Sequence, residues 1–208
     1  MTLEGVDGCG KSTQLSFLAE YLRGLGFDVL LTREPGGCRI SEQVRSILLE
    51  PENKEMSAET EMLLYAAART QHIDETILPA LEQGKIVLCD RYLDSSIAYQ
   101  GYARGLGVER VLEANRYAVE RCLPDATFLF LLEVGSSFAR IKSGRTGTDR
   151  LEQEGRSFFD KVDEGFRALA DEEARILVID ASKGVNAVSQ ELAGKVDEVF
   201  KKWQSISG

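Results

Sequence analysis

The chain has few cysteines, none of them paired, and little histidine. Its 208 residues include one histidine and four cysteines, and Cys9, Cys38, Cys89 and Cys122 are scattered along the chain with no CxxC spacing. A zinc site or a disulfide framework is therefore not expected. Reduced thiols favour a cytoplasmic protein.

The chain also lacks a long apolar run. No stretch approaches the roughly 20 apolar residues that a helix needs to cross a bilayer. The first residues show no basic stretch followed by an apolar one, so we expect neither a signal peptide nor a membrane association.

Basic residues are outnumbered by acidic ones. There are 25 lysines and arginines against 34 aspartates and glutamates, which gives a net charge of −9. Proteins that bind a nucleic-acid backbone usually carry a basic face, so no nucleic-acid partner is expected. A local cluster of arginines can still bind a small phosphorylated ligand.

What the chain does have is an alternation of short apolar runs and longer amphipathic stretches, which is typical of a parallel sheet covered by helices. We expect strands near residues 1–4, 27–32, 86–89, 126–132 and 175–179, and helices near 12–24, 39–49, 58–83, 108–121, 154–173 and 185–203. The pattern predicts an α/β fold with three layers, in which helices flank a five-stranded parallel sheet. A length of 208 residues fits one domain over residues 1–208.

The first strand runs directly into a phosphate-binding loop. Residues 5–12 match the pattern GxxxxGK[ST] and lie between an apolar strand and a helical pattern, which predicts a P-loop NTPase fold. The glycines allow successive N–H groups to face phosphate oxygens, and the following helix directs the positive end of its dipole to the same anion. The expected ATP-binding residues are Gly5, Val6, Asp7, Gly8, Cys9, Gly10, Lys11, Ser12 and Thr13.

Within this loop, Lys11 is expected to reach the β- and γ-phosphates, and the Ser12 hydroxyl to join the shell of a Mg²⁺ ion. The buried strand at 86–89 ends in Asp90, which suits the aspartate that P-loop enzymes place near that ion. Arg91 follows, and a guanidinium at the end of a parallel strand suits a second phosphate group.

Further arginines indicate a phosphoryl acceptor. Arg33, Arg45 and Arg69 lie in or beside predicted loops and helices. A segment of small residues near 142–153 carries Arg145 and Arg150 between two helices, and we interpret it as a mobile lid. Arginines delivered by a lid would neutralise charge on the transferred group and exclude water.

These residues together resemble the bacterial thymidylate kinase family. The resemblance lies in the segments EGVDGCGKST, TREPGG, LLYAAARTQH and LCDRYLDSSIAYQG, and in residues 149–152 and 158–162. It covers nearly the whole chain, and the second and fourth segments are far more specific than the P-loop. It implies that the chain phosphorylates dTMP to dTDP with ATP and Mg²⁺, in dTTP biosynthesis, and forms a homodimer.

The resemblance also implies roles at the dTMP site. Tyr65 stands where the family usually has the phenylalanine that stacks on thymine, Arg69 matches the arginine that binds the base, and Ser96 and Gln100 line the base pocket. A donor–acceptor pair there reads the N3–H and O4 of thymine and rejects cytosine, whose pattern is inverted. The remaining expected contacts are Tyr99 beside the deoxyribose, Arg45 and Arg91 on the acceptor phosphate, Glu34 next to that phosphate, and Asp7 on the 3′-hydroxyl or the Mg²⁺ shell.

Two departures from the family pattern bear on the mechanism. Ala68 replaces the acid that precedes the base arginine, which removes a supporting ion pair. The P-loop has no arginine between Gly5 and Lys11, so the resemblance implies that the lid supplies the catalytic one, with Arg150 favoured over Arg145. The expected catalytic residues are Lys11, Arg91, Arg145 and Arg150.

Two alternatives stay open. Another P-loop kinase of similar size, such as a deoxynucleoside kinase, would share the loop and the arginines. A regulatory P-loop protein would hydrolyse ATP without transferring the phosphoryl group to a second nucleotide.

Overall fold

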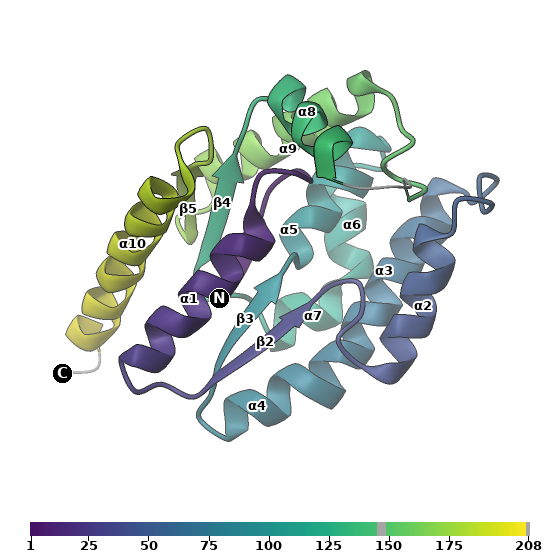
Figure 1. Cartoon of the computed structure of the whole chain (residues 1–208). Helices are drawn as coiled ribbons and strands as arrows, with labels where there is room; N and C mark the ends of the chain where they lie inside the picture. Colours follow the sequence, from purple (N-terminus) through teal and green to yellow (C-terminus); the bar gives the residue numbers. More distant parts are fainter. Residues whose placement is uncertain (145–148, 207–208) are drawn as a thin grey trace.

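The structure is a computed structural model that describes residues 1–144 and 149–206. Helices flank a five-stranded sheet with the strand order β2-β3-β1-β4-β5 (Figure 1). Every pair of neighbouring strands is parallel. The strands are β1 (Thr2–Glu4), β2 (Val29–Arg33), β3 (Ile86–Asp90), β4 (Thr127–Leu131) and β5 (Ile176–Asp180). The predicted three-layer P-loop fold is confirmed.

The sheet is buried on both faces, as the apolar runs predict. Leu88 of β3 and Phe128 and Phe130 of β4 have no exposed surface. Helix α1 (Lys11–Gly24) contacts β1, β2 and β3, and α10 (Val185–Ile206) contacts α1 and β5. Both lie in front of the sheet in Figure 1, whereas α9 (Arg156–Glu172) lies behind β4 and β5.

The remaining helices surround the carboxyl ends of the strands and the β2–β3 side. They are α2 (Arg39–Leu49), α3 (Ala58–His72), η1 (Ile73–Ile77), α4 (Leu78–Glu82), α5 (Leu93–Ser96), η2 (Ile97–Ala103), α6 (Val108–Ala114), α7 (Arg116–Arg121) and α8 (Val134–Gly144). Among the described residues, no helix is both long enough and apolar enough to cross a membrane.

Two of the expected helices are subdivided. The stretch predicted as one helix over 58–83 contains a π-helical turn, η1, between α3 and α4. The helix predicted over 108–121 is broken at Asn115, whose backbone leaves the helical region and whose side chain bonds the carbonyl of Val111. A side chain that bonds a nearby backbone group competes with the helix in this way.

Two helical segments lie outside the helix ranges expected from the sequence. One is the continuous α5–η2 run after β3, and the other is α8 after β4. The π-helical part, η2, carries Tyr99 and Gln100, and π-helical turns are frequent at functional sites. Its residues are nearly all buried, so the 3.6-residue alternation that marks an amphipathic helix is absent there.

Candidate active site

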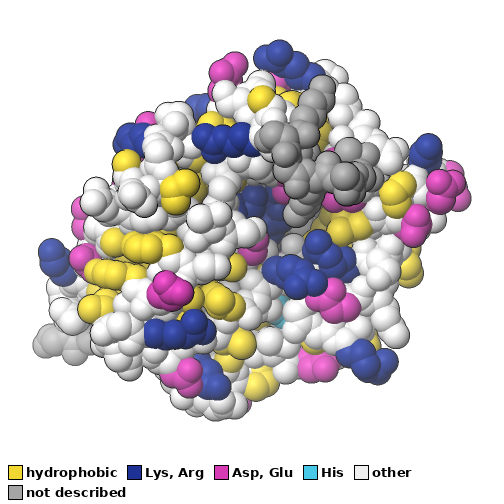
Figure 2. Space-filling model, in the orientation of Figure 1, with side chains coloured by type: hydrophobic (Ala, Val, Ile, Leu, Met, Phe, Trp, Pro, Cys, Tyr) yellow, Lys and Arg dark blue, Asp and Glu magenta, His cyan; other side chains and the backbone are white. Residues whose placement is uncertain are grey.

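A cavity of about 620 Å³ opens at the carboxyl ends of β1, β2 and β3. Figure 2 shows Lys and Arg side chains gathered around a hollow in this face. Most of the residues expected at the site line this cavity: Asp7, Gly8, Gly10, Lys11, Ser12, Thr13, Glu34, Arg45, Tyr65, Arg69, Asp90, Arg91, Ser96, Tyr99 and Gln100. The structure therefore brings the P-loop and the arginines of the expected acceptor site to one space.

The P-loop holds Lys11 against its own backbone. The Lys11 Nζ donates to the carbonyl oxygens of Gly5 at 2.9 Å and Val6 at 3.1 Å. Gly5 has φ +135°, and a Cβ there would lie 2.5 Å from the carbonyl oxygen of Phe130, so only glycine fits. Gly5, Val6 and Cys9 do not line the cavity.

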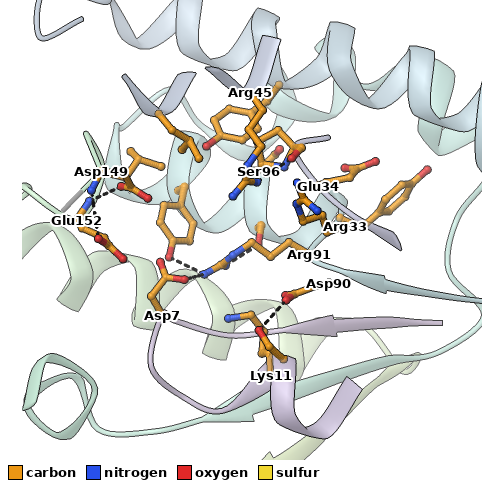
Figure 3. A pocket seen from close by; sticks show the side chains of 18 of the residues that line it. Asp7, Lys11, Arg33, Glu34, Arg45, Asp90, Arg91, Ser96, Asp149 and Glu152 are labelled. Carbon is orange, nitrogen blue, oxygen red and sulfur yellow. Dashed lines mark hydrogen bonds and ion pairs between the residues drawn. The ribbon is translucent and has the colours of Figure 1, made fainter. Parts of the chain in front are cut away.

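Asp90 and Ser12 both line the cavity, and Asp90 lies below Arg91 in the view of Figure 3. The Ser12 Oγ donates to Asp90 Oδ2 at 3.4 Å. The other carboxylate oxygen, Oδ1, is buried and has no hydrogen-bond partner in the part of the chain that the structure describes. A buried, unpartnered carboxylate oxygen beside a hydroxyl is a donor set that suits Mg²⁺.

Arg91 occupies the centre of the site (Figure 3). Its φ of +67° lies in the left-handed region, a strained backbone for an arginine. The guanidinium donates to Asp7 Oδ1 at 2.7 Å and Ser95 Oγ at 3.0 Å, and contacts Tyr99 Oη at 3.4 Å. Burial, the largest single effect, lowers its pKa, but Asp7, Tyr99, Asp90 and Glu4 together outweigh burial and raise the pKa well above the ordinary value.

The turn that holds Arg91 is anchored from below by Glu4. The buried Glu4 carboxylate accepts hydrogen bonds from the Tyr92 backbone N–H at 2.7 Å and from Ser95 Oγ at 2.6 Å. Burial, followed by the charge of Asp94, raises the pKa of Glu4 to about 7. The end of β1 thus fixes the position of the residues that follow β3.

A second arginine group lies on the β2 side of the cavity. Arg45 Nη1 donates to the carbonyl oxygen of Pro35 at 2.8 Å. Burial lowers the pKa of Arg45, and the neighbouring charge of Arg33 lowers it further. Arg33 also lines the cavity and pairs with Glu42 on α2. Two positively charged side chains on this side of the cavity favour a negatively charged ligand there.

The other end of the cavity contains rings and amides. Tyr65 from α3 and Ser96 and Gln100 from the α5–η2 run line it. The Ser96 Oγ is buried and has no hydrogen-bond partner among the described residues. A buried hydroxyl with free hydrogen-bonding capacity in a cavity wall is available to a polar ligand.

Arg69 also lines this end of the cavity, and its side chain is almost fully buried. Its Nε donates to Glu34 Oε2 at 2.7 Å, its Nη1 to Asn115 Oδ1 and its Nη2 to the Tyr92 carbonyl oxygen at 3.0 Å. Glu34 Oε1 lies 2.9 Å from His72 Nδ1. Glu34 therefore supplies the ion pair that the missing acid at Ala68 does not.

Comparisons with known proteins agree with this geometry. The family model for thymidylate kinase matches residues 3–192. The chain belongs to the thymidylate kinase family. The thymidylate kinase of Geobacillus sp. (strain WCH70) is 49% identical over 201 residues, which cover 95% of this chain and 96% of that one. The thymidylate kinase of Exiguobacterium sibiricum is 46% identical over 208 residues, which cover 100% and 98%.

A solved structure is also similar. The crystal structure of thymidylate kinase from Ehrlichia chaffeensis superposes with a TM-score of 0.75 at 34% identity, and the match covers 94% of this chain and 96% of that chain.

Of the two arginines that the lid is expected to supply, the structure describes Arg150, and it is held within the fold. Arg150 is buried: its Nη2 donates to Glu61 Oε2 at 2.6 Å and its Nε to the Leu48 carbonyl oxygen at 2.9 Å. It does not line the cavity, although Asp149, on its N-terminal side, does. A γ-phosphate contact from Arg150 therefore requires its release from Glu61. Arg145 lies outside the described residues.

Arg140, Asn115 and Glu61 are among the residues of the site that were not predicted from the sequence. Arg140 of α8 lines the cavity, Asn115 bonds Arg69, and Glu61 bonds Gln100 and Arg150. None of the three lies within the sequence segments on which the resemblance to thymidylate kinases rests.

Proposed function

We propose that this chain transfers the γ-phosphoryl group of ATP to dTMP, giving ADP and dTDP, in dTTP biosynthesis. One observation carries the proposal: a single cavity joins the P-loop to an arginine pair and then to a buried group of ring and amide side chains. A nucleoside monophosphate offers a phosphate to the arginines and a base to the ring and amide side chains. Family membership supports the same activity.

The donor half is the P-loop. Lys11 would exchange its bonds to the loop carbonyls for bonds to the β- and γ-phosphates, and Gly8, Gly10 and Thr13 would bind the phosphates from the cavity floor. The N-terminus of α1, which begins at Lys11, adds its dipole.

Mg²⁺ is expected between the two halves. Asp90 Oδ1 and Ser12 Oγ are the residues that would hold it, directly or through water, and their chemistry fits a hard cation. When bound, the ion neutralises charge on the β- and γ-phosphates. Asp90 and Ser12 fix its position from the end of β3 and the start of α1.

The acceptor half begins with the monophosphate. Arg45 and Arg91 would bind it, with Glu34 behind them holding Arg69 in place. Arg91 also donates to Asp7 of the P-loop, so the Arg91–Asp7 pair would connect the acceptor phosphate to the donor loop. Such positioning lets the acceptor oxygen attack in line. The acceptor is an ionised phosphate, so no general base is required.

At the far end, Tyr65 would stack on the thymine ring, and Ser96, Gln100 and Arg69 would bind its polar edge. Tyr99 would lie beside the deoxyribose, where its ring already contacts Arg91. Asp7 would contact the 3′-hydroxyl or the Mg²⁺ shell.

We further propose that the segment near 142–153 closes over ATP and that Arg150 or Arg145 then meets the γ-phosphate. The homodimer also remains a proposal. It is supported by the exposed apolar side chains Ile40 and Ile47 on α2 and Leu63 on the adjacent α3. Light scattering of the purified protein tests the dimer.

ADP release in a coupled assay with dTMP, dUMP, dCMP, dGMP and thymidine tests the activity. We expect dTMP to give the highest kcat/KM. A preference for thymidine would favour a deoxynucleoside kinase. Turnover that does not depend on an acceptor would favour an ATPase.

A further inference from the structure

Glu61 is a fully buried carboxylate behind the end of the cavity that Tyr65, Ser96 and Gln100 line. It lies on α3, one helical turn before Tyr65, and does not itself line the cavity. Burying a charge is costly unless it is paired and hydrogen-bonded. The contacts of Glu61 therefore indicate what it does.

Three side chains donate to this carboxylate. Gln100 Nε2 donates to Oε1 at 2.8 Å. Arg104 donates from Nε to Oε1 at 3.2 Å and from Nη2 to Oε2 at 3.0 Å, and Arg150 Nη2 donates to Oε2 at 2.6 Å. Burial, the largest single effect, would raise the pKa of Glu61, but the hydrogen bonds from Arg104, Gln100 and Arg150 and the charge of Arg104 together outweigh it and lower that pKa. Glu61 is thus ionised at neutral pH and only accepts hydrogen bonds.

An acceptor on this side decides which way the Gln100 amide faces. The NH₂ group can bond Glu61, whereas the carbonyl oxygen would be repelled by it. Gln100 is 1% exposed and lies in the cavity wall, so water offers it little alternative. The orientation of the Gln100 amide is therefore fixed, and its second N–H and its carbonyl oxygen face a ligand in fixed positions.

We propose that Glu61 is a positioning residue that fixes this order of donor and acceptor on Gln100, and so selects thymine over cytosine. The inference rests on the proposed function, because it requires the base of the acceptor to lie against Gln100. Arg104 and Arg150 keep the Glu61 carboxylate charged and stationary.

The hydrogen-bonding groups of the two bases determine that a fixed Gln100 amide favours thymine. Thymine presents an acceptor at O4 and a donor at N3–H, and cytosine presents a donor at its amino group and an acceptor at N3. A fixed amide that complements the first pair opposes the second. An amide free to turn over complements either base and loses the discrimination.

Replacement of Glu61 by Gln tests this. The new amide can either accept from or donate to Gln100, so both orientations of Gln100 become possible. We expect the ratio of kcat/KM for dTMP to that for dCMP to fall about tenfold, mainly through a higher KM for dTMP and a lower KM for dCMP. A purely structural loss would lower both activities together and leave the ratio unchanged.

Three further variants make the test sharper. Glu59→Gln removes a charge from the same helix at a solvent-exposed ion pair with Arg110, and should leave the ratio unchanged. Glu61→Asp keeps the charge for the arginines but withdraws the acceptor from Gln100. It should also lower the ratio, and it serves if Glu61→Gln does not fold. In a Gln100→Met background, Glu61→Gln should have no additional effect on the ratio.

The outcomes separate the two levels of inference. A wild-type protein without dTMP turnover would overturn the proposed function and this inference with it. Wild-type turnover of dTMP with an unchanged dTMP-to-dCMP ratio in folded Glu61→Gln or Glu61→Asp would overturn the role of Glu61 alone. An additive effect of Glu61→Gln in the Gln100→Met background would also overturn it.

Discussion

The Nε of Arg69 lies 2.7 Å from Oε2 of Glu34, and both side chains are almost fully buried. This ion pair connects α3 to the residue that follows β2. The pair holds Arg69, the arginine expected to bind the thymine base, in position. In the family pattern an acid precedes this arginine, but here that residue is Ala68, which has no charge. Glu34 reaches the same guanidinium from 35 residues away.

We expect Glu34→Gln to lower the free energy of unfolding by about 3 kcal/mol, since it leaves a buried guanidinium without its counter-ion. The KM for dTMP should rise with it. Urea denaturation and steady-state kinetics measure the two effects. Asp28→Asn, which removes an exposed pair with Lys85, is the control and should cost less than about 1 kcal/mol. Equal losses in both variants would contradict the importance of the buried pair.

Lys11→Ala should remove nearly all turnover, because Lys11 is the loop's charged contact to the transferred group. The fold should persist, since within the described part of the chain the Lys11 ammonium bonds only backbone oxygens and the Cys9 thiol. Single-turnover kinetics with labelled ATP measure the rate, and circular dichroism checks the fold. Substantial residual activity would mean that this loop is not the donor site.

Asp90→Asn should raise the Mg²⁺ concentration needed for half-maximal activity by about tenfold, the lower end of the range typical for residues that hold or orient a metal ligand. Saturating Mg²⁺ should restore part of the rate. A titration of activity against Mg²⁺ at fixed ATP measures this. An unchanged requirement would remove Asp90 from the metal site.

Arg150→Ala separates two roles of one side chain. Loss of the bond to Glu61 should lower the free energy of unfolding by about 3 kcal/mol. If Arg150 also meets the γ-phosphate, kcat should fall by about 10³-fold or more with little change in the KM for dTMP. A loss of stability with kcat retained would confine Arg150 to its structural contact.

Glu4 should make the stability of the protein depend on pH. Burial and Asp94 raise its pKa from 4.5 to about 7 on folding, so the folded state favours the protonated form. Its contribution to stability is complete below pH 4.5 and is lost as the pH rises through about 7, by about 3 kcal/mol in total. Arg91, whose charge favours the ionised form, and hydrogen bonds from Ser95 and Tyr92 reduce this shift.

Urea denaturation of the wild type and of Glu4→Gln between pH 5 and 8 measures the Glu4 component as the difference in slope. We expect the stability of the wild type to fall more steeply with rising pH. Parallel curves would show that Glu4 does not titrate in this range.

Much of the fold could be predicted from the sequence because its signals are local. The amphipathic stretch 39–49 is α2 with the same bounds, and the doubly apolar runs are β3 and β4. The P-loop also follows from local residues. The α5–η2 run could not be predicted because its residues are nearly all buried. A buried helix has no polar face, so its sequence lacks the 3.6-residue alternation of an amphipathic helix.

The site was predictable only where residue type dictated the chemistry. Asp90 and Arg91 follow from their position at a strand end. The burial of Arg150 against Glu61 could not be predicted, because it depends on packing between segments 89 residues apart. The bond from Asn115 to Arg69 likewise spans 46 residues and has no local sequence pattern.

Strand β1 has only three residues, yet it is the central strand, hydrogen-bonded to β3 on one side and to β4 on the other. Amide protons of such a strand exchange with solvent only when the whole sheet opens, whereas helices at the periphery open in smaller fluctuations. We therefore expect the strand to which the P-loop is attached to open later than the peripheral helices. Local opening around α2 and α3 would expose the acceptor end of the cavity while the loop that receives the triphosphate keeps its shape.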